Sequence, residues 1–175
     1  MTQDAFTRLG KGEPLLCLVS ENFTDGELAQ ILAERYCLLL PQKQKPDASA
    51  IAREAGAGQM RILASGGNCL AAMDAARALG DKAGPVVLLS PPNIENAVGN
   101  DAPKFQTLAL FGTRGAPVAE AGAFKRTVSA SHIMYVFDAV DLERERPQAV
   151  AEAALDFLAR SEGFLVNNLD GRLFA

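Results

Sequence analysis

The chain has 175 residues, of which 49% are hydrophobic and 22% are charged, and its formal net charge is −4. This length fits a single domain that buries enough apolar surface to need no disulfide or structural metal. The slightly acidic balance gives no basic surface for a phosphate backbone, which argues against nucleic acid as a partner.

The sequence also indicates where the protein works. No apolar run approaches the roughly 20 residues that cross a bilayer, and the polar N-terminus lacks the apolar core of a secretory signal. Cys17, Cys37 and Cys69 form no Cys-x-x-Cys pair, and they are predicted to be buried free thiols of a reducing compartment. We therefore expect a cytoplasmic protein with no membrane contact.

Apolar runs of strand length alternate with stretches of helical period along the chain. In chain order, a strand is predicted at 15–20, a helix at 25–35 that Thr24 or Asp25 can cap, a strand at 36–40, a helix at 48–57, a strand at 61–65, a helix at 69–79, a strand at 85–90, a strand at 107–112, a helix at 117–128, a strand at 133–139 and a helix at 145–160. Residues 163–166, with Leu173 and Phe174, are expected to add a small edge element.

This alternation predicts an α/β fold. The expected architecture is a three-layer sandwich, in which a mostly parallel sheet of about six strands carries helices on both faces. In such folds the functional site lies at the carboxyl ends of the strands.

Four segments together resemble the α/β-hydrolase fold superfamily. Residues 6–16 (FTRLGKGEPLL) look like its opening hairpin, and residues 61–92 look like its nucleophile strand, the following helix and a strand ending in LLSPP. Residues 107–118 resemble the strand and loop that deliver the acid, and residues 134–158 resemble the last strand, the histidine loop and the closing helix. Only residues 93–106 occupy the interval of the usual cap, so the resemblance implies a short member without a cap.

The resemblance also implies that the catalytic triad is missing. Gly66 stands where the family has its nucleophile, on the strand-to-helix turn of the G-x-S-x-G type. Gly115 stands at the position of the acid, and Asp141 stands at the position of the histidine. The oxyanion segment after the first core strand is altered to Val19-Ser20.

The single histidine, His132, does not replace the missing base. It precedes the predicted strand 133–139, so a rise of about 3.3 Å per residue puts it roughly 20 Å from the carboxyl edge. A general base must reach within about 3 Å of the proton that it removes. We therefore interpret His132 as a structural residue near the opposite edge of the sheet.

Two other nucleophiles lie near the turn. Ser65 precedes the expected nucleophile position by one residue, and a shift at the turn would present it, although without a histidine. Cys69 begins the next helix, where the helix dipole can activate a thiol, but its apolar neighbours favour a packed thiol. The acidic residues Asp141, Glu143 and Glu145 are interpreted as a solvated helix start and not as a metal site.

We therefore expect a catalytically degenerate α/β-hydrolase-like protein, a pseudoenzyme, which acts as a binding or partner subunit. Its expected partner is a second copy of itself or a hydrolase-like relative, because apolar surface left by a missing cap commonly marks an interface. The alternatives are a divergent hydrolase with a non-standard site and a small-molecule sensor. No cofactor and no metal are expected, and the residues predicted to line a pocket are Val19, Ser20, Ser65, Gly66, Gly67, Asn68 and Asp141.

Overall fold

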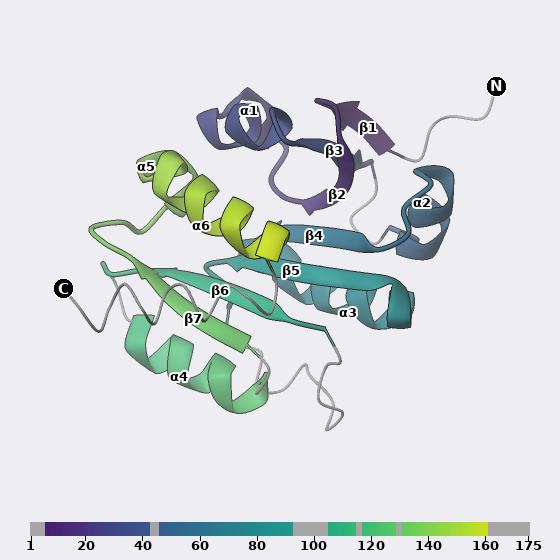
Figure 1. The fold of residues 1–175 in the computed structure, drawn as a ribbon. Helices are drawn as coiled ribbons and strands as arrows, with labels where there is room; N and C mark the ends of the chain where they lie inside the picture. Colours follow the sequence, from purple (N-terminus) through teal and green to yellow (C-terminus); the bar gives the residue numbers. More distant parts are fainter. Residues whose placement is uncertain (1–5, 43–45, 93–104, 115–116, 129–130, 161–175) are drawn as a thin grey trace.

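A seven-stranded sheet forms the centre of the molecule in a computed structural model that describes residues 6–42, 46–92, 105–114, 117–128 and 131–160. The strands follow the order β1-β3-β2-β4-β5-β6-β7, and only the β1–β3 pair is antiparallel (Figure 1). The strands are β1 (Phe6–Leu9), β2 (Glu13–Leu18), β3 (Tyr36–Pro41), β4 (Met60–Ser65), β5 (Ala83–Leu89), β6 (Thr107–Gly112) and β7 (Ser131–Val136).

Helices cover both faces of this sheet, as the sequence predicts. The apolar side chains of α2 (Ala48–Glu54), α3 (Cys69–Leu79) and α4 (Pro117–Thr127) share one buried cluster with the strands. Those of α1 (Glu27–Ala33), α5 (Leu142–Glu145) and α6 (Pro147–Arg160) share a second cluster on the opposite face. The predicted three-layer α/β sandwich is therefore confirmed.

The structure corrects several predicted boundaries. The sheet has seven strands and not about six, because the opening segment contributes β1 as an antiparallel edge strand. The predicted opening hairpin does not form, since β3 lies between β1 and β2 and pairs with both. The helix predicted at 145–160 is α6, which begins two residues later at Pro147, whose missing backbone N–H suits the first position of a helix. The short helix α5 before it was not predicted. Helix α1 begins after Gly26 without a side-chain cap, so Thr24 and Asp25 do not cap it. The edge element predicted at 163–166 lies outside the described residues.

Glycine makes the first turn of the chain possible. Gly10 and Gly12, between β1 and β2, have φ angles of +83° and +118°. A Cβ on Gly10 would lie 2.4 Å from the carbonyl oxygen of Ala33 at the end of α1. The turn between β1 and β2 therefore packs so closely on the end of α1 that no side chain fits there.

One arginine ties the amino ends of three strands to the last helix. The Arg61 guanidinium pairs with Glu13 at 2.7 Å (Nη1 to Oε2), and its Nε donates to the carbonyl of Leu158 at 3.1 Å. It also lies 5.7 Å above the ring of Tyr36. This contact set joins β2, β3 and β4 to α6.

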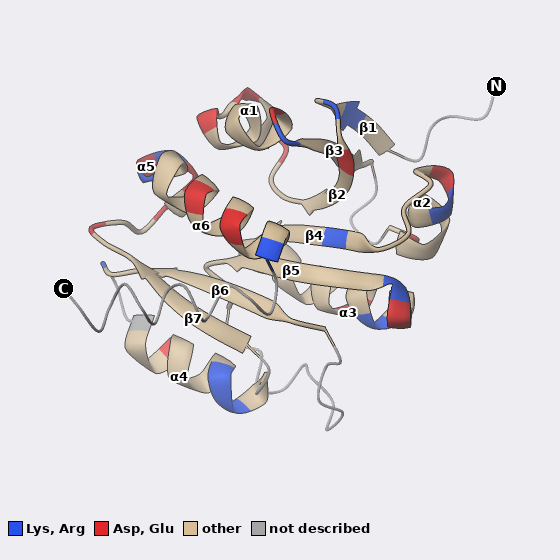
Figure 2. Ribbon diagram, in the orientation of Figure 1, with Lys and Arg blue, Asp and Glu red and all other residues tan. Residues whose placement is uncertain are grey.

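Strands β5, β6 and β7 carry no Lys, Arg, Asp or Glu, whereas charged residues lie on helices, on turns and on β1, β2 and β4 (Figure 2). Strands β2 and β4–β6 are almost entirely buried, which explains their continuous apolar runs. Because all strands from β2 to β7 are parallel, their carboxyl ends meet at one edge of the sheet. The residues that follow those ends form the candidate site.

Candidate functional site

The turn after β4 keeps a sharp backbone and lacks a reactive side chain at its apex. Strand β4 ends at Ser65, one 3-10 turn covers Gly66–Asn68, and α3 begins at Cys69. Gly66 has a φ angle of +52°, which lies in the left-handed region. Residues other than glycine adopt this region only at a cost in free energy. A Cβ built on Gly66 meets no atom within 4 Å. The turn thus has open space at the position where a nucleophile would stand.

Ser65 forms a contact that the sequence analysis missed. Its side chain hydrogen bonds with the carboxylate of Glu143, in α5. Burial raises the pKa of Glu143, and the hydrogen bond from Ser65 offsets only part of that effect. Glu143 stood in the sequence as one of three acidic residues at a helix start, and nothing in their spacing singles it out. It is the short α5 that carries this carboxylate to the end of β4.

Cys69 is a packed thiol. Its side chain is fully buried, and its Sγ donates to the carbonyl oxygen of Leu89 at 3.7 Å. Burial raises the pKa of Cys69 to about 12, although the residue begins a helix. The thiol therefore stays protonated at neutral pH and is a poor nucleophile.

The loop after β7 is held by ion pairs. Asp138 has a φ angle of +52°, and its N–H donates to Oγ1 of Thr113 at 2.8 Å. The Asp138 carboxylate pairs with Arg114 at 3.3 Å and with Arg146 at 3.1 Å, and Arg114 also pairs with Glu145. We call the four residues Arg114, Asp138, Glu145 and Arg146 the ionic cluster. It joins the residues that follow β6 and β7 to the end of α5 and the start of α6.

Asp141 serves as a helix cap at the place where the resemblance puts a histidine. Its carboxylate accepts from the N–H of Arg144 at 3.4 Å, at the start of α5. Its own N–H donates to Oε1 of Glu145 at 3.0 Å. These two bonds satisfy backbone N–H groups at the first turn of α5 and stabilise the helix start. Gly115, the third triad position, lies outside the described residues.

His132 belongs to the other end of the sheet. It is the second residue of β7, paired with Leu108, and not a loop residue before the strand as predicted. Its ring packs edge-on against Phe157 of α6, with 5.9 Å between the ring centroids. Burial lowers the pKa of His132, and the nearby Lys125 lowers it further. Asp141 and the turn at Gly66 lie at the opposite ends of the strands.

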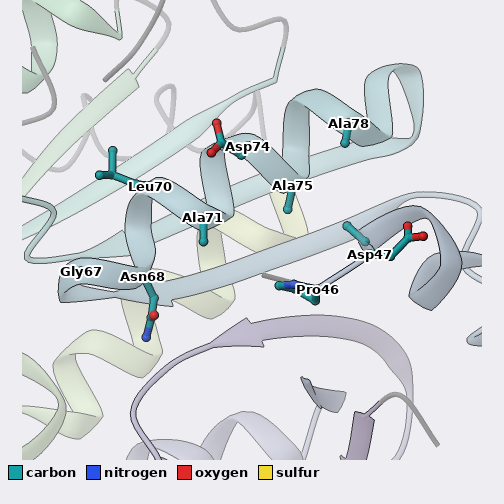
Figure 3. Close-up of a pocket in the computed structure, with 10 residues that line it drawn as sticks. Pro46, Asp47, Gly67, Asn68, Leu70, Ala71, Asp74, Ala75 and Ala78 are labelled. Atoms are coloured by element: carbon teal, nitrogen blue, oxygen red, sulfur yellow. The ribbon is translucent and has the colours of Figure 1, made fainter. Parts of the chain in front are cut away.

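Two hollows adjoin the turn and share Asn68. A pocket of about 250 Å³ is lined by Val19, Ser20 and Asn68, together with residues at the ends of β2 and β3. A groove of about 550 Å³ runs along α3, with Ala71 and Ala75 on one side and Pro46 on the other (Figure 3). The second volume lies in the range typical of small-molecule sites. Gly67 also lines the groove, whereas Ser65, Gly66 and Asp141 line neither hollow.

Two further findings concern ligands and membranes. Among the described residues, no three His, Cys, Asp or Glu side chains converge closely enough to hold a metal ion. In the same part of the chain, no helix has the length and apolarity that crossing a membrane requires.

No protein-family model and no curated protein matches this sequence. Solved structures do match. An α/β hydrolase from the metagenome of lagoon sediments at Mar Chica, Morocco, superposes with a TM-score of 0.70 and 12% identity, over 90% of this chain and 95% of that one. An esterase from Thermogutta terrifontis has a TM-score of 0.69 and 15% identity, over 89% and 92%.

A thioesterase domain from the curacin biosynthetic pathway is similar to the same extent, with a TM-score of 0.68 and 10% identity over 86% of this chain and 93% of that domain. At sequence identities this low, structural similarity shows a shared fold and does not show a shared chemistry. The strand order, the parallel sheet with one antiparallel edge and the sharp turn after β4 agree with that likeness. The chain therefore has the α/β-hydrolase fold.

Proposed function

We propose that the protein is a pseudoenzyme of the α/β-hydrolase fold that works as a binding or partner subunit. The observation that carries this proposal is Gly66, which occupies the apex of the turn with a φ angle of +52° and open space above it. A serine mechanism needs a hydroxyl at that apex and an imidazole within hydrogen-bond reach. This chain has neither there.

The loop after β7 supports the same proposal. Asp141 is engaged as a helix cap, and its neighbours in the ionic cluster are paired with one another. Side chains held in this way stabilise the loop and are not directed at a substrate. The one histidine lies at the far end of β7.

Ester hydrolysis and active-site labelling test the proposal. The purified chain is incubated with p-nitrophenyl esters of several acyl lengths and with a fluorophosphonate probe. We expect no turnover above a buffer control and no labelled serine. The variant Gly66→Ser provides a matched control, because it restores a hydroxyl at the apex without a base and should stay inactive. Enzymatic turnover by the natural chain contradicts the pseudoenzyme proposal.

One observation favours a second candidate, a divergent hydrolase. The hydrogen bond between Ser65 and Glu143 places a carboxylate of raised pKa beside a hydroxyl, which is the relation of a base to a nucleophile. Under this alternative, Ser65→Ala and Glu143→Gln each abolish turnover and labelling, while Ser20→Ala leaves both unchanged. Turnover that survives in Ser65→Ala excludes this second candidate.

A further inference from the structure

The outer edge of β7 presents a short, uncharged stretch of backbone and side chains. Strand β7 is the last strand on its side of the sheet, and in the described part of the chain it pairs with β6 alone (Figure 1). Exposed large apolar side chains gather there. Of the four that the described residues contain, Tyr135, Phe137 and Val140 lie in β7 or just after it, with 45%, 81% and 56% of their surface exposed.

The hydrogen bonds tell which backbone groups of β7 face outward. The carbonyl of Val136 accepts from the N–H of Thr113, so Val136 faces β6. Because successive residues of a strand direct their backbone groups to alternate sides, Met134 and His132 face β6 as well. Ser131, Ile133, Tyr135 and Phe137 therefore direct their backbone groups away from the sheet.

Two cations occupy the ends of this outward row. The Lys125 ammonium donates to the carbonyl of Ser131, and Nε of Arg146 donates to the carbonyl of Phe137 at 3.3 Å. Between them, the N–H and C=O groups of Ile133 and Tyr135 have no hydrogen-bond partner among the described residues. The open part of the edge is thus two outward-facing residues, and we call it the β7 window.

We propose that the β7 window pairs with the same window of a second copy of this chain, across a two-fold axis that passes beside Met134. This inference rests on the proposed partner role and specifies its surface. In this antiparallel register Ile133 lies opposite Tyr135 of the second copy, and the reverse pair follows by symmetry. Each of these pairs exchanges two N–H···O bonds, so all the open groups are used.

Side-chain chemistry supports this register and this occupant. Ile133 and Tyr135 lie on one face of β7, where Tyr135 packs near Phe111 with 6.4 Å between ring centroids. An aromatic side chain opposite a β-branched one is a favourable cross-strand pair. The strand SHIMYV contains no Lys, Arg, Asp or Glu, so the pairing sets no like charges of the strands against each other. A register shifted by two residues would use the already bonded carbonyl of Ser131 or Phe137.

Cysteine cross-linking tests the register. In the proposed pairing Met134 lies directly opposite Met134 of the second copy, as a non-hydrogen-bonded pair with about 4.5 Å between Cα atoms, which suits a disulfide. We expect Met134→Cys to form a disulfide-linked dimer under mild oxidation, seen on a non-reducing gel. Ile133→Cys serves as the control, because its two copies would be about 8 Å apart and beyond disulfide reach. Equal cross-linking of both variants, or none, overturns the proposal.

Sedimentation tests the association itself. At tens of micromolar, the natural chain should sediment as a species of twice its 18.5 kDa mass. Tyr135→Lys, which sets a charge in the window, should raise the dimer Kd at least tenfold, while Val118→Lys on α4, an exposed position outside the window, should not change it. A monomer at 100 µM overturns the proposal. Ester turnover by the monomer and dimer alike would instead refute the pseudoenzyme role and leave the interface standing.

Discussion

The turn after β4 and the loop after β7, the two regions that the sequence resemblance links to catalytic side chains, are built in opposite ways. At the first, Gly66 leaves the backbone sharp and the space above it empty. At the second, the ionic cluster and the Asp141 cap fill the loop with mutual contacts. One region leaves open space beside its backbone, and the other fills its space with side-chain contacts.

This difference teaches that the backbone of each region is preserved for a different reason. The turn needs a residue that tolerates a positive φ, because β4 passes directly into α3. The loop needs partners for its charges and for the start of α5. If this interpretation is correct, substitutions in the turn report on backbone conformation, whereas those in the loop report on close packing and side-chain bonds.

The largest effect is expected at Gly112, where β6 meets the loop after β7. A Cβ there would lie 2.1 Å from the carbonyl oxygen of Ala139, so the loop must move to accept it. Gly112→Ala should therefore destabilise the protein by about 3 kcal/mol, measured by urea denaturation. Gly67→Ala is the control, since its Cβ meets nothing within 4 Å, and it should change stability by less than about 1 kcal/mol. Equal effects would show that the loop is not closely packed.

A smaller cost is expected at Gly66 itself. In Gly66→Ala the added Cβ meets no neighbouring atom. The alanine must still adopt a φ angle of +52°, which should lower the free energy of unfolding by about 1–2 kcal/mol. Gly66→Asn should cost less, because asparagine tolerates the left-handed region. Chemical denaturation of both variants gives the comparison. If alanine costs nothing, the turn has relaxed and no longer holds the sharp conformation.

Removing the cap of α5 should have an effect of about 1 kcal/mol. Asp141→Ala deletes the carboxylate that accepts from the N–H of Arg144, and lost caps typically cost that much. Asp141→Asn keeps an acceptor and should retain most of the stability. The measurement is the unfolding midpoint of the three proteins in urea. An unchanged midpoint for Asp141→Ala would mean that the ionic cluster holds the loop without the cap.

The smallest effect depends on pH and concerns Glu143, which links the two regions. Burial raises its pKa in the folded protein above the usual 4.5, so the folded state binds the proton more tightly than the unfolded state does. The stability associated with this group is therefore present below pH 4.5 and is lost as pH rises through the folded pKa. Glu143→Gln should stabilise the protein by less than about 1 kcal/mol at pH 7 and have a smaller effect at pH 4.

Differential scanning calorimetry at the two pH values measures this difference, and Glu145→Gln is the comparison variant. Glu145 pairs with Arg114, so its neutralisation should not stabilise the protein at pH 7. A lower Tm for Glu143→Gln at pH 7 would show that the charged form of Glu143 is favoured by its surroundings.

The architecture was predictable because the pattern of apolar residues indicates which segments are buried and whether neighbouring strands are parallel. Continuous apolar runs such as that of β5, separated by helical periods, are typical of a parallel sheet covered on both faces. The position of Gly66 at the turn followed from the resemblance of residues 61–92 to a strand, a sharp turn and a helix. The hydrogen bond between Ser65 and Glu143 was not predictable, because these residues are far apart in the chain and their contact depends on where α5 begins. The strand predicted to end at residue 139 ends at Val136 in the structure. The apolar run gives no sign of the positive φ angle of Asp138, which ends the strand.

Arg61 has a consequence for how such a chain changes over time. Its bonds to Glu13 and Leu158 secure the amino ends of the strands, whereas Gly66 and Asp141 lie beyond their carboxyl ends. Substitutions at that edge therefore leave this anchorage intact. The fold does not depend on the side chains at the carboxyl ends of the strands, and selection can change them without losing the architecture.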